Sequence, residues 1–93
     1  MKARFNNTVI AESDNAVKIE GKFYFPPDSV KMEFLTQSDF HIRSPRKGEA
    51  NFYNITADGE WISDAAWYYP APEDATLPIK DYVAFWKAVE VVE

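Results

Sequence analysis

Apolar and polar residues alternate over short runs along most of the chain, a pattern typical of half-buried β-strands. Val17 and Ile19, for example, are separated by Lys18, which places the two apolar side chains on one face of a strand. By the same reasoning, strands are predicted over residues 3–5, 8–12, 16–20, 23–25, 49–56, 60–62, 65–69, 82–86 and 89–92. Tight turns are expected at Asn6-Asn7 and at Asp58-Gly59, because these residue types accept a positive φ.

The C-terminal runs over 82–86 and 89–92 are expected to pair with each other. A helix over 79–92 is the alternative, but the β-branched and aromatic residues there favour strands.

Prolines mark the ends of several predicted elements. Pro26-Pro27 ends the strand over 23–25, because proline cannot donate a hydrogen bond to a neighbouring strand. Asp28 and Ser29 are then expected to cap one short helix from Val30 to Leu35. Residues 70–78 contain three prolines and are predicted to form a surface loop. The pattern predicts a single mainly β domain over residues 1–93, with a small barrel-like or two-sheet arrangement and one short helix.

Composition excludes several classes of chemistry. The chain has no cysteine, which excludes disulfides, thiolate catalysis and zinc sites that use sulfur, and His41 is the only histidine, which excludes a multi-histidine metal site. We therefore expect no metal and no cofactor. No apolar run is long enough for a transmembrane helix and no signal peptide is recognisable, so a cytoplasmic location is expected. The net charge of −5 argues against binding to nucleic acid or to an anionic membrane.

Against this acidic background, the segment from His41 to Gly48 is basic. It contains two of the three arginines, Arg43 and Arg46, together with Lys47, whereas residues outside 41–47 include 7 basic and 15 acidic ones. Arginine offers a planar fork to phosphate or carboxylate, lysine a compact charge, and Gly48 lets backbone amides approach a ligand. We expect this segment to bind a small anion, although the cations could instead pair with the surplus acids on the surface.

Aromatic residues are the second candidate feature. Alternation puts Trp67 and Tyr69 on one face of a strand and Tyr68 on the other. Tyr24, Tyr53, Trp67 and Tyr69 would suit a flat or sugar-like anion if they lined a cleft beside the basic segment. The sequence leaves open which of them line a cleft and which fill the core.

Five stretches occur in a specific order and cover nearly the whole chain: Val9–Ser13, Tyr24–Val30, Ser44–Gly48, Ala65–Pro70 and Val83–Trp86. Together they resemble the family catalogued as domain of unknown function 427. The resemblance implies a compact, mainly β domain similar to β-tent folds, and the family sometimes carries a nucleotidyltransferase-like label. Ser44 stands where the family often has a cysteine, so a thiol or zinc role is excluded for this chain.

Nucleotidyl transfer requires a glycine-rich turn for the triphosphate and carboxylates that hold magnesium. The glycines Gly21, Gly48 and Gly59 are isolated, and the alternating acids lie at predicted turns, so the residues do not support that label.

Three kinds of function stay open. The first is binding of a small anionic ligand, for which the candidate residues are His41, Arg43, Arg46, Lys47, Gly48, Tyr24, Tyr53, Trp67 and Tyr69. The second is an enzyme, a hydrolase or transferase that uses His41 or a carboxylate as acid or base. The third is a protein-interaction or self-association module, including a homodimer.

Overall fold

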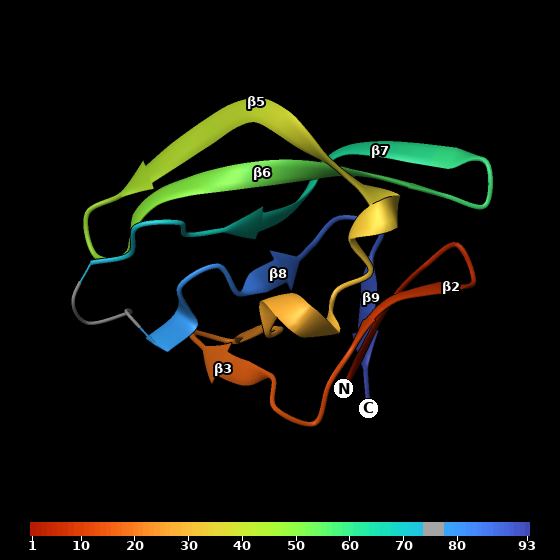
Figure 1. Cartoon of the computed structure of the whole chain (residues 1–93), viewed down its shortest axis with the longest axis horizontal. Helices are drawn as coiled ribbons and strands as arrows, with labels where there is room; N and C mark the ends of the chain where they lie inside the picture. The colour runs from red at the N-terminus through yellow and green to blue at the C-terminus, as the bar shows by residue number, and fades with distance from the viewer. Residues whose placement is uncertain (74–77) are drawn as a thin grey trace.

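The computed structural model describes residues 1–73 and 78–93, and within them the chain forms nine strands in three sheets. The first sheet has the order β2-β1-β9 and consists of β1 (Lys2–Phe5), β2 (Thr8–Glu12) and β9 (Glu90–Val92). Because β1 and β9 pair antiparallel, the two ends of the chain lie side by side (Figure 1).

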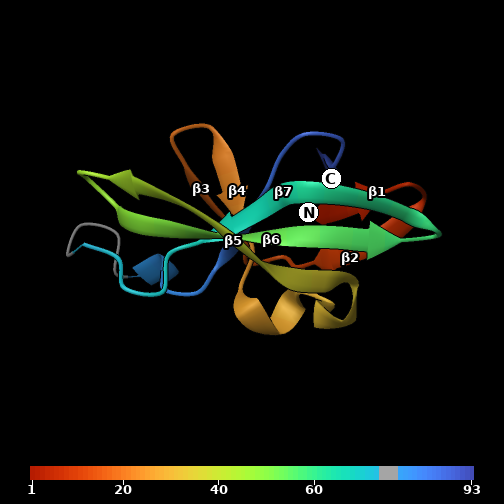
Figure 2. The same ribbon diagram turned by 90° about the horizontal axis from the view of Figure 1, so that it is seen from above.

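The second sheet is antiparallel, has the order β5-β6-β7-β8 and contains the longest strands. It consists of β5 (Leu35–Ser44), β6 (Gly48–Ala57), β7 (Glu60–Tyr68) and β8 (Val83–Phe85). The third sheet is the hairpin of β3 (Val17–Ile19) and β4 (Lys22–Tyr24). In Figures 1 and 2 the long strands β5, β6 and β7 arch over the shorter elements. The predicted mainly β fold is confirmed, and the three sheets do not close into a barrel over the described residues.

The predicted tight turns are confirmed by their backbone angles. Asn6 and Asn7 have φ values of 51° and 71°, and Asp58 and Gly59 have values of 53° and 78°. Both residues of each turn are therefore left-handed, as required where a two-residue turn matches the twist of the flanking strands.

The predicted helix from Val30 to Leu35 is wrong in its position and form. The chain instead makes two short 3-10 turns, η1 (Pro27–Ser29) and η2 (Met32–Phe34), separated by the extended residue Val30. Val30 forms a β-bridge with Ala11, and the Lys31 N–H donates to the Ile10 carbonyl at 2.8 Å. These hydrogen bonds to β2 replace those that a continuous helix would make.

The predicted pairing of the two C-terminal strands is also wrong. β8 pairs with β7, whereas β9 pairs with β1. After β8 the Trp86 N–H donates to the Ala65 carbonyl at 3.0 Å, and Lys87 has a φ of 58°. This left-handed residue redirects the chain to the other sheet.

The strands predicted separately over 60–62 and 65–69 belong to one strand, β7. Asp64 interrupts it with a φ of 53°, and its N–H donates to the Asn54 side-chain oxygen at 3.0 Å. A register shift of β6 against β7 lies at the same place, so the interruption is a bulge and not a turn.

Both faces of the four-stranded sheet are packed. One face buries Ile55, Val83 and Phe85 against Ile10 and Phe25. A second cluster forms around buried residues that include Tyr24, Phe52, Tyr69, Ile79 and Ala84. Reciprocal backbone hydrogen bonds between Phe25 and Val83, of 2.8 and 2.9 Å, attach β4 to β8 and so hold the small hairpin beside the large sheet.

Residues 70–73 have no regular secondary structure, as the predicted loop over 70–78 requires, whereas its residues 74–77 lie outside the described part of the chain. In residues 1–73 and 78–93 no helix is long and apolar enough to cross a membrane.

Candidate functional site

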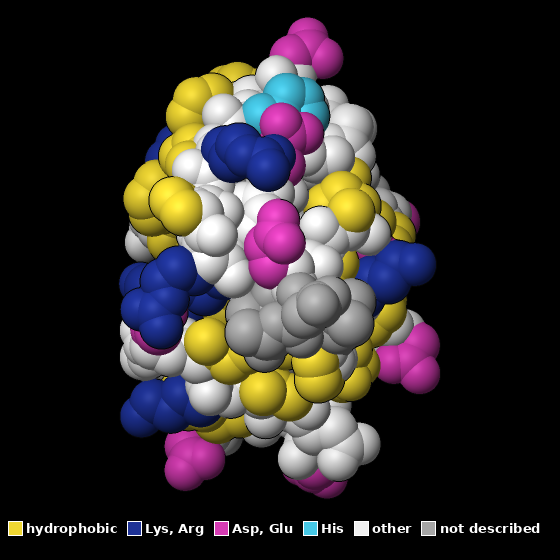
Figure 3. All heavy atoms as spheres, turned by 90° about the vertical axis from the view of Figure 1, so that its left-hand side faces the viewer, with side chains coloured by type: hydrophobic (Ala, Val, Ile, Leu, Met, Phe, Trp, Pro, Cys, Tyr) yellow, Lys and Arg dark blue, Asp and Glu magenta, His cyan; other side chains and the backbone are white. Residues whose placement is uncertain are grey.

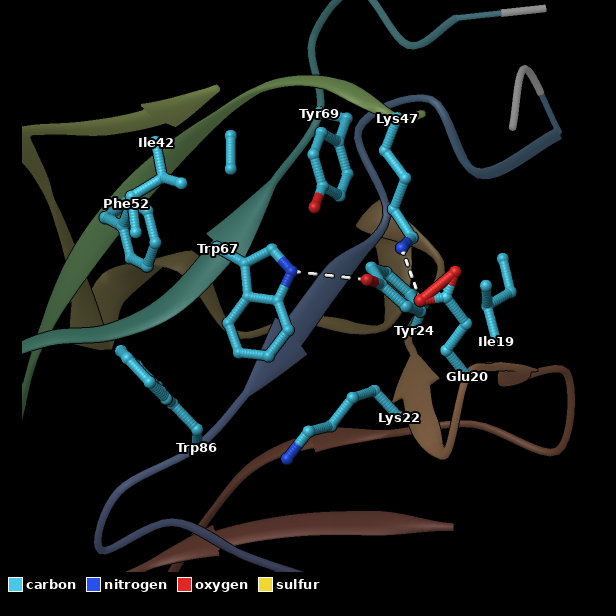
Figure 4. Close-up of a pocket in the computed structure, with 11 residues that line it drawn as sticks. Ile19, Glu20, Lys22, Tyr24, Ile42, Lys47, Phe52, Trp67, Tyr69 and Trp86 are labelled. Carbon is cyan, nitrogen blue, oxygen red and sulfur yellow. Dashed lines mark hydrogen bonds and ion pairs between the residues drawn. The ribbon is translucent and has the colours of Figure 1, made fainter. Parts of the chain in front are cut away.

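A hollow of about 380 Å³ lies between the β3–β4 hairpin and the four-stranded sheet (Figure 4). Aromatic side chains dominate its walls, with two lysines, one glutamate and three aliphatic residues completing them. The lining consists of Tyr24, Phe52, Trp67, Tyr69, Trp86, Lys22, Lys47, Glu20, Ile19, Ile42 and Ala50. We call this hollow the aromatic pocket.

Strand register explains why the aromatic rings meet. Phe52 on β6 lies directly opposite Trp67 on β7, and their ring centroids are 6.3 Å apart. Trp86, which follows β8, meets Trp67 edge-on at 5.8 Å, and Tyr24 from β4 meets Trp67 edge-on at 6.2 Å. Perpendicular contacts of this kind are favourable because the positive edge of one ring meets the negative face of the other. Trp67 is thus the centre of the aromatic wall.

Two phenols supply neutral polar groups. The Trp67 indole N–H donates to the Tyr24 hydroxyl at 3.3 Å, and the rings of Tyr24 and Tyr69 are 6.4 Å apart. Burial, and then the neighbouring Tyr24 phenol, raises the pKa of Tyr69 to about 12. The Tyr69 hydroxyl stays protonated near neutral pH and is hydrogen-bonded to the Tyr24 hydroxyl, so the two phenols form one neutral polar group beside the Trp67 indole.

The charged end of the pocket is an ion pair between two turns. The Lys47 ammonium, from the turn between β5 and β6, lies 2.9 Å from Oε2 of Glu20, at the tip of the β3–β4 hairpin. The Lys47 side chain is 13% exposed and that of Glu20 is 57% exposed. The hydrogen bond and charge of Lys47, with a smaller contribution from Arg46, lower the pKa of Glu20.

Gly48 fixes the position of the turn that carries Lys47. Its φ is 99°, and a Cβ atom there would lie 3.0 Å from the Ala71 carbonyl oxygen. The Glu73 N–H also donates to the Lys47 carbonyl at 3.1 Å. The turn is therefore packed against residues 71–73, which is why glycine is required.

Lys22 provides a second cation of a different kind. It extends from β4 toward Trp86 in Figure 4, and its side chain has no hydrogen bond or ion pair with any described residue. Among the described residues, Lys22, Lys47 and Glu20 are the charged ones that line the pocket, and together they carry a net charge of +1 in a chain of net charge −5.

The structure brings together four of the nine predicted site residues in this pocket: Lys47, Tyr24, Trp67 and Tyr69. Gly48 supports the turn without lining the hollow. The alternation expected for Trp67, Tyr68 and Tyr69 is confirmed, since Tyr68 stacks on Tyr53 at 4.7 Å and neither of these two tyrosines lines the pocket.

The remaining basic residues point elsewhere. His41 and Arg43 lie opposite Asn51 and Glu49 in the strand register, whereas Ile42 between them lines the pocket. Arg46 is exposed and is not among the lining residues. In Figure 3, Lys and Arg side chains are interspersed with Asp and Glu side chains at this end of the molecule.

His41 is placed in a polar environment on the outer face of β5. Its Nδ1 atom is 2.8 Å from the Asn51 side-chain oxygen and 4.0 Å from a Glu49 carboxylate oxygen. Ser44 lies in the same strand, and its hydroxyl accepts a hydrogen bond from the Lys47 N–H at 3.3 Å. The two side chains thus have separate partners. Residues 1–73 and 78–93 contain no cluster of three or more His, Asp or Glu side chains suited to a metal ion.

Sequence reasoning missed the other described lining residues, which are Glu20, Lys22, Phe52, Trp86, Ile19, Ile42 and Ala50. For Lys22 a signal was available, because it is two residues before Tyr24 and therefore shares its strand face. Trp86 had no such signal, because it follows the end of β8 and its orientation depends on the turn that leads to β9.

The fold and the pocket define a small, mainly β domain with an aromatic-walled cavity of a size suited to a small molecule. The chain belongs to the family described as Domain of unknown function (DUF427), which matches it over residues 1–93. The resemblance seen in the sequence is therefore confirmed over the whole chain. No curated protein matches the sequence.

Proposed function

We propose that this domain binds a small, flat, anionic molecule in the aromatic pocket. The observation that supports the proposal is the convergence of five aromatic side chains and two lysine ammonium groups on one hollow. Apolar walls with a few polar groups that fix orientation are characteristic of small-molecule sites.

The shape of the pocket favours a planar ligand. Its volume of about 380 Å³ lies at the lower end of the range for small-molecule sites. Trp67 and Trp86 are in direct contact at 80° to each other, so a planar ligand would lie against the wall that the two indoles form and not between them. The hydrogen-bonded phenols of Tyr24 and Tyr69 offer a neutral polar group to a polar atom on the ring.

The charge of the pocket favours an acidic group on that ligand. Lys22 has no carboxylate partner among the described residues, so an anion could bind it without displacing any of these residues. Lys47 already shares its charge with Glu20. Of the basic segment His41–Gly48, the proposal therefore uses Lys47 directly, and it makes Lys22 the main anion partner.

Isothermal titration calorimetry with indole-3-acetate, indole-3-acetamide and tryptamine tests the proposal. These probes share one ring system and differ in side-chain charge. We expect the acid to bind most tightly and the amine least tightly. Tightest binding by the amine, or no binding by any of the three, would contradict the proposal.

Lys22→Gln separates the role of charge from that of shape. The substitution should weaken binding of the acid by about three- to tenfold, the range expected for an exposed charged hydrogen bond, and leave binding of the amide nearly unchanged. Lys31→Gln is the matched control, because Lys31 is an exposed lysine that does not line the pocket. Equal effects of the two substitutions on the acid would show that Lys22 does not bind it.

A further inference from the structure

A second hollow, of about 360 Å³, adjoins the aromatic pocket and shares two lining residues with it, Lys22 and Trp86. Its other walls come from the tip of the β3–β4 hairpin and from the segment between β8 and β9, and they include Gly21, Phe23 and Lys87. Because both hollows use the same lysine and the same tryptophan, the Lys22 side chain lies at the boundary between them.

The charged residues of the second hollow are both cations. Lys22 and Lys87 line it, and no acidic side chain is among its described lining residues, although acids outnumber bases by 15 to 10 in the chain. The Lys87 ammonium donates to the Ser63 carbonyl and lies 5.6 Å from the centroid of the Trp86 ring. A neutral carbonyl does not compensate the positive charge, and an ammonium group has three donors, so Lys87 can still bind an anion.

Trp86 is held in place at the boundary. Its indole N–H donates to the Asp64 carbonyl, and its backbone N–H donates to the Ala65 carbonyl at 3.0 Å. Both bonds anchor it to the bulge in β7. The apolar part of a ligand could therefore contact the fixed Trp86 ring while its charged end binds the lysines that line the second hollow, Lys22 and Lys87.

We propose that the ligand is a flat ring with an acidic group on a flexible tether, bound with its ring in the aromatic pocket and its acid between Lys22 and Lys87 in the second hollow. This inference rests on the proposed function, which supplies the ring site. The shared chemistry is a tethered anion, and a carboxylate and a phosphate monoester both provide it.

The experiment compares indole-3-acetate with indole-3-butyrate, which carries the same ring and acid on a longer tether. Calorimetry on the intact chain should show the longer acid binding several-fold more tightly. Lys87→Gln should remove this gain and leave binding of indole-3-acetate unchanged, whereas Lys87→Arg should retain the gain. Indole-3-butyramide, which lacks the charge, should show no response to Lys87→Gln.

Each other result has a distinct meaning. If neither acid binds, the proposed function fails. If both acids bind equally and Lys87→Gln alters neither, the aromatic pocket binds the ring but the acid does not reach the second hollow, and the inference fails alone. If Lys87→Gln weakens acid and amide alike, Lys87 acts by supporting Trp86, and the inference is again overturned. Indole-3-ethyl phosphate, compared with indole-3-butyrate, shows which acid the two lysines prefer.

Discussion

Gly48→Ala should destabilise the domain strongly, because the substitution combines two unfavourable effects. The φ of 99° lies in a region that side chains with a Cβ rarely occupy. The added methyl group would also lie 3.0 Å from the Ala71 carbonyl oxygen, so residues 71–73 or the Lys47 turn must move. The hydrogen bond of 3.1 Å from the Glu73 N–H to the Lys47 carbonyl opposes that movement.

The magnitude follows from the two contributions. A left-handed conformation costs a residue with a Cβ about 1–2 kcal/mol, and overpacking a close contact costs a further 1–3 kcal/mol or so. The free energy of unfolding should therefore fall by about 2–5 kcal/mol. For a domain of this size each kcal/mol lowers Tm by roughly 4–8 °C, so a decrease on the order of 10 °C or more is expected.

Gly59→Ala is the matched control. Gly59 has a φ of 78°, but a methyl group added there would have no atom within 4 Å, so only the backbone contribution applies. Urea unfolding followed by circular dichroism should show a loss of about 1–2 kcal/mol for this variant. Equal losses for Gly48→Ala and Gly59→Ala would refute the argument that the contact with Ala71 fixes the turn.

Two further predictions concern the polar groups of the pocket. Glu20→Gln should raise the affinity for indole-3-acetate about two- to fivefold in calorimetry, because Lys47 then loses its competing carboxylate. An unchanged affinity would show that Lys47 does not contact the ligand. Glu60→Gln is the control, because Glu60 is exposed and does not line the pocket. Tyr69 has a pKa raised from 10.0 to about 12, so it stabilises the folded state below pH 10 and this contribution is lost as the pH rises through about 12. Tyr69→Phe should accordingly make the decline in unfolding free energy between these pH values shallower, as urea titrations can measure. Part of the decline should remain, because burial also raises the pKa of Tyr53 to about 12. A decline of unchanged steepness would contradict the assignment to Tyr69.

Much of the fold follows from local chemistry that the sequence displays. Asn6-Asn7 and Asp58-Gly59 accept positive φ at both turn positions, so the hairpins on either side of them were predictable. The alternation around Trp67 placed it with Tyr69 and apart from Tyr68, and the structure confirms this because side chains of a strand alternate between its faces.

Pairing between distant segments could not be predicted in the same way. The helix expected from Val30 to Leu35 is replaced by two 3-10 turns because Val30 and Lys31 bond to β2, which lies far away in the sequence. β9 pairs with β1 and not with β8, and no local pattern distinguishes these partners. Propensity describes a residue in its own segment, whereas strand partners are chosen by contacts that the whole chain makes.

The candidate site shows the same division. Composition and charge marked Lys47 and its neighbours as unusual, and the aromatic runs marked Tyr24, Trp67 and Tyr69. The alternation of side chains along β5 then separates the basic residues from the pocket, because His41 and Arg43 lie on one face of the strand and Ile42, which lines the pocket, lies on the other. The sequence shows which charges are close together along the chain. The lining of the pocket depends instead on which side of each strand is turned toward the neighbouring sheet in the folded protein. For that reason a basic segment of eight residues contributes one ammonium group to the aromatic pocket, and Lys22, distant in sequence, contributes the other.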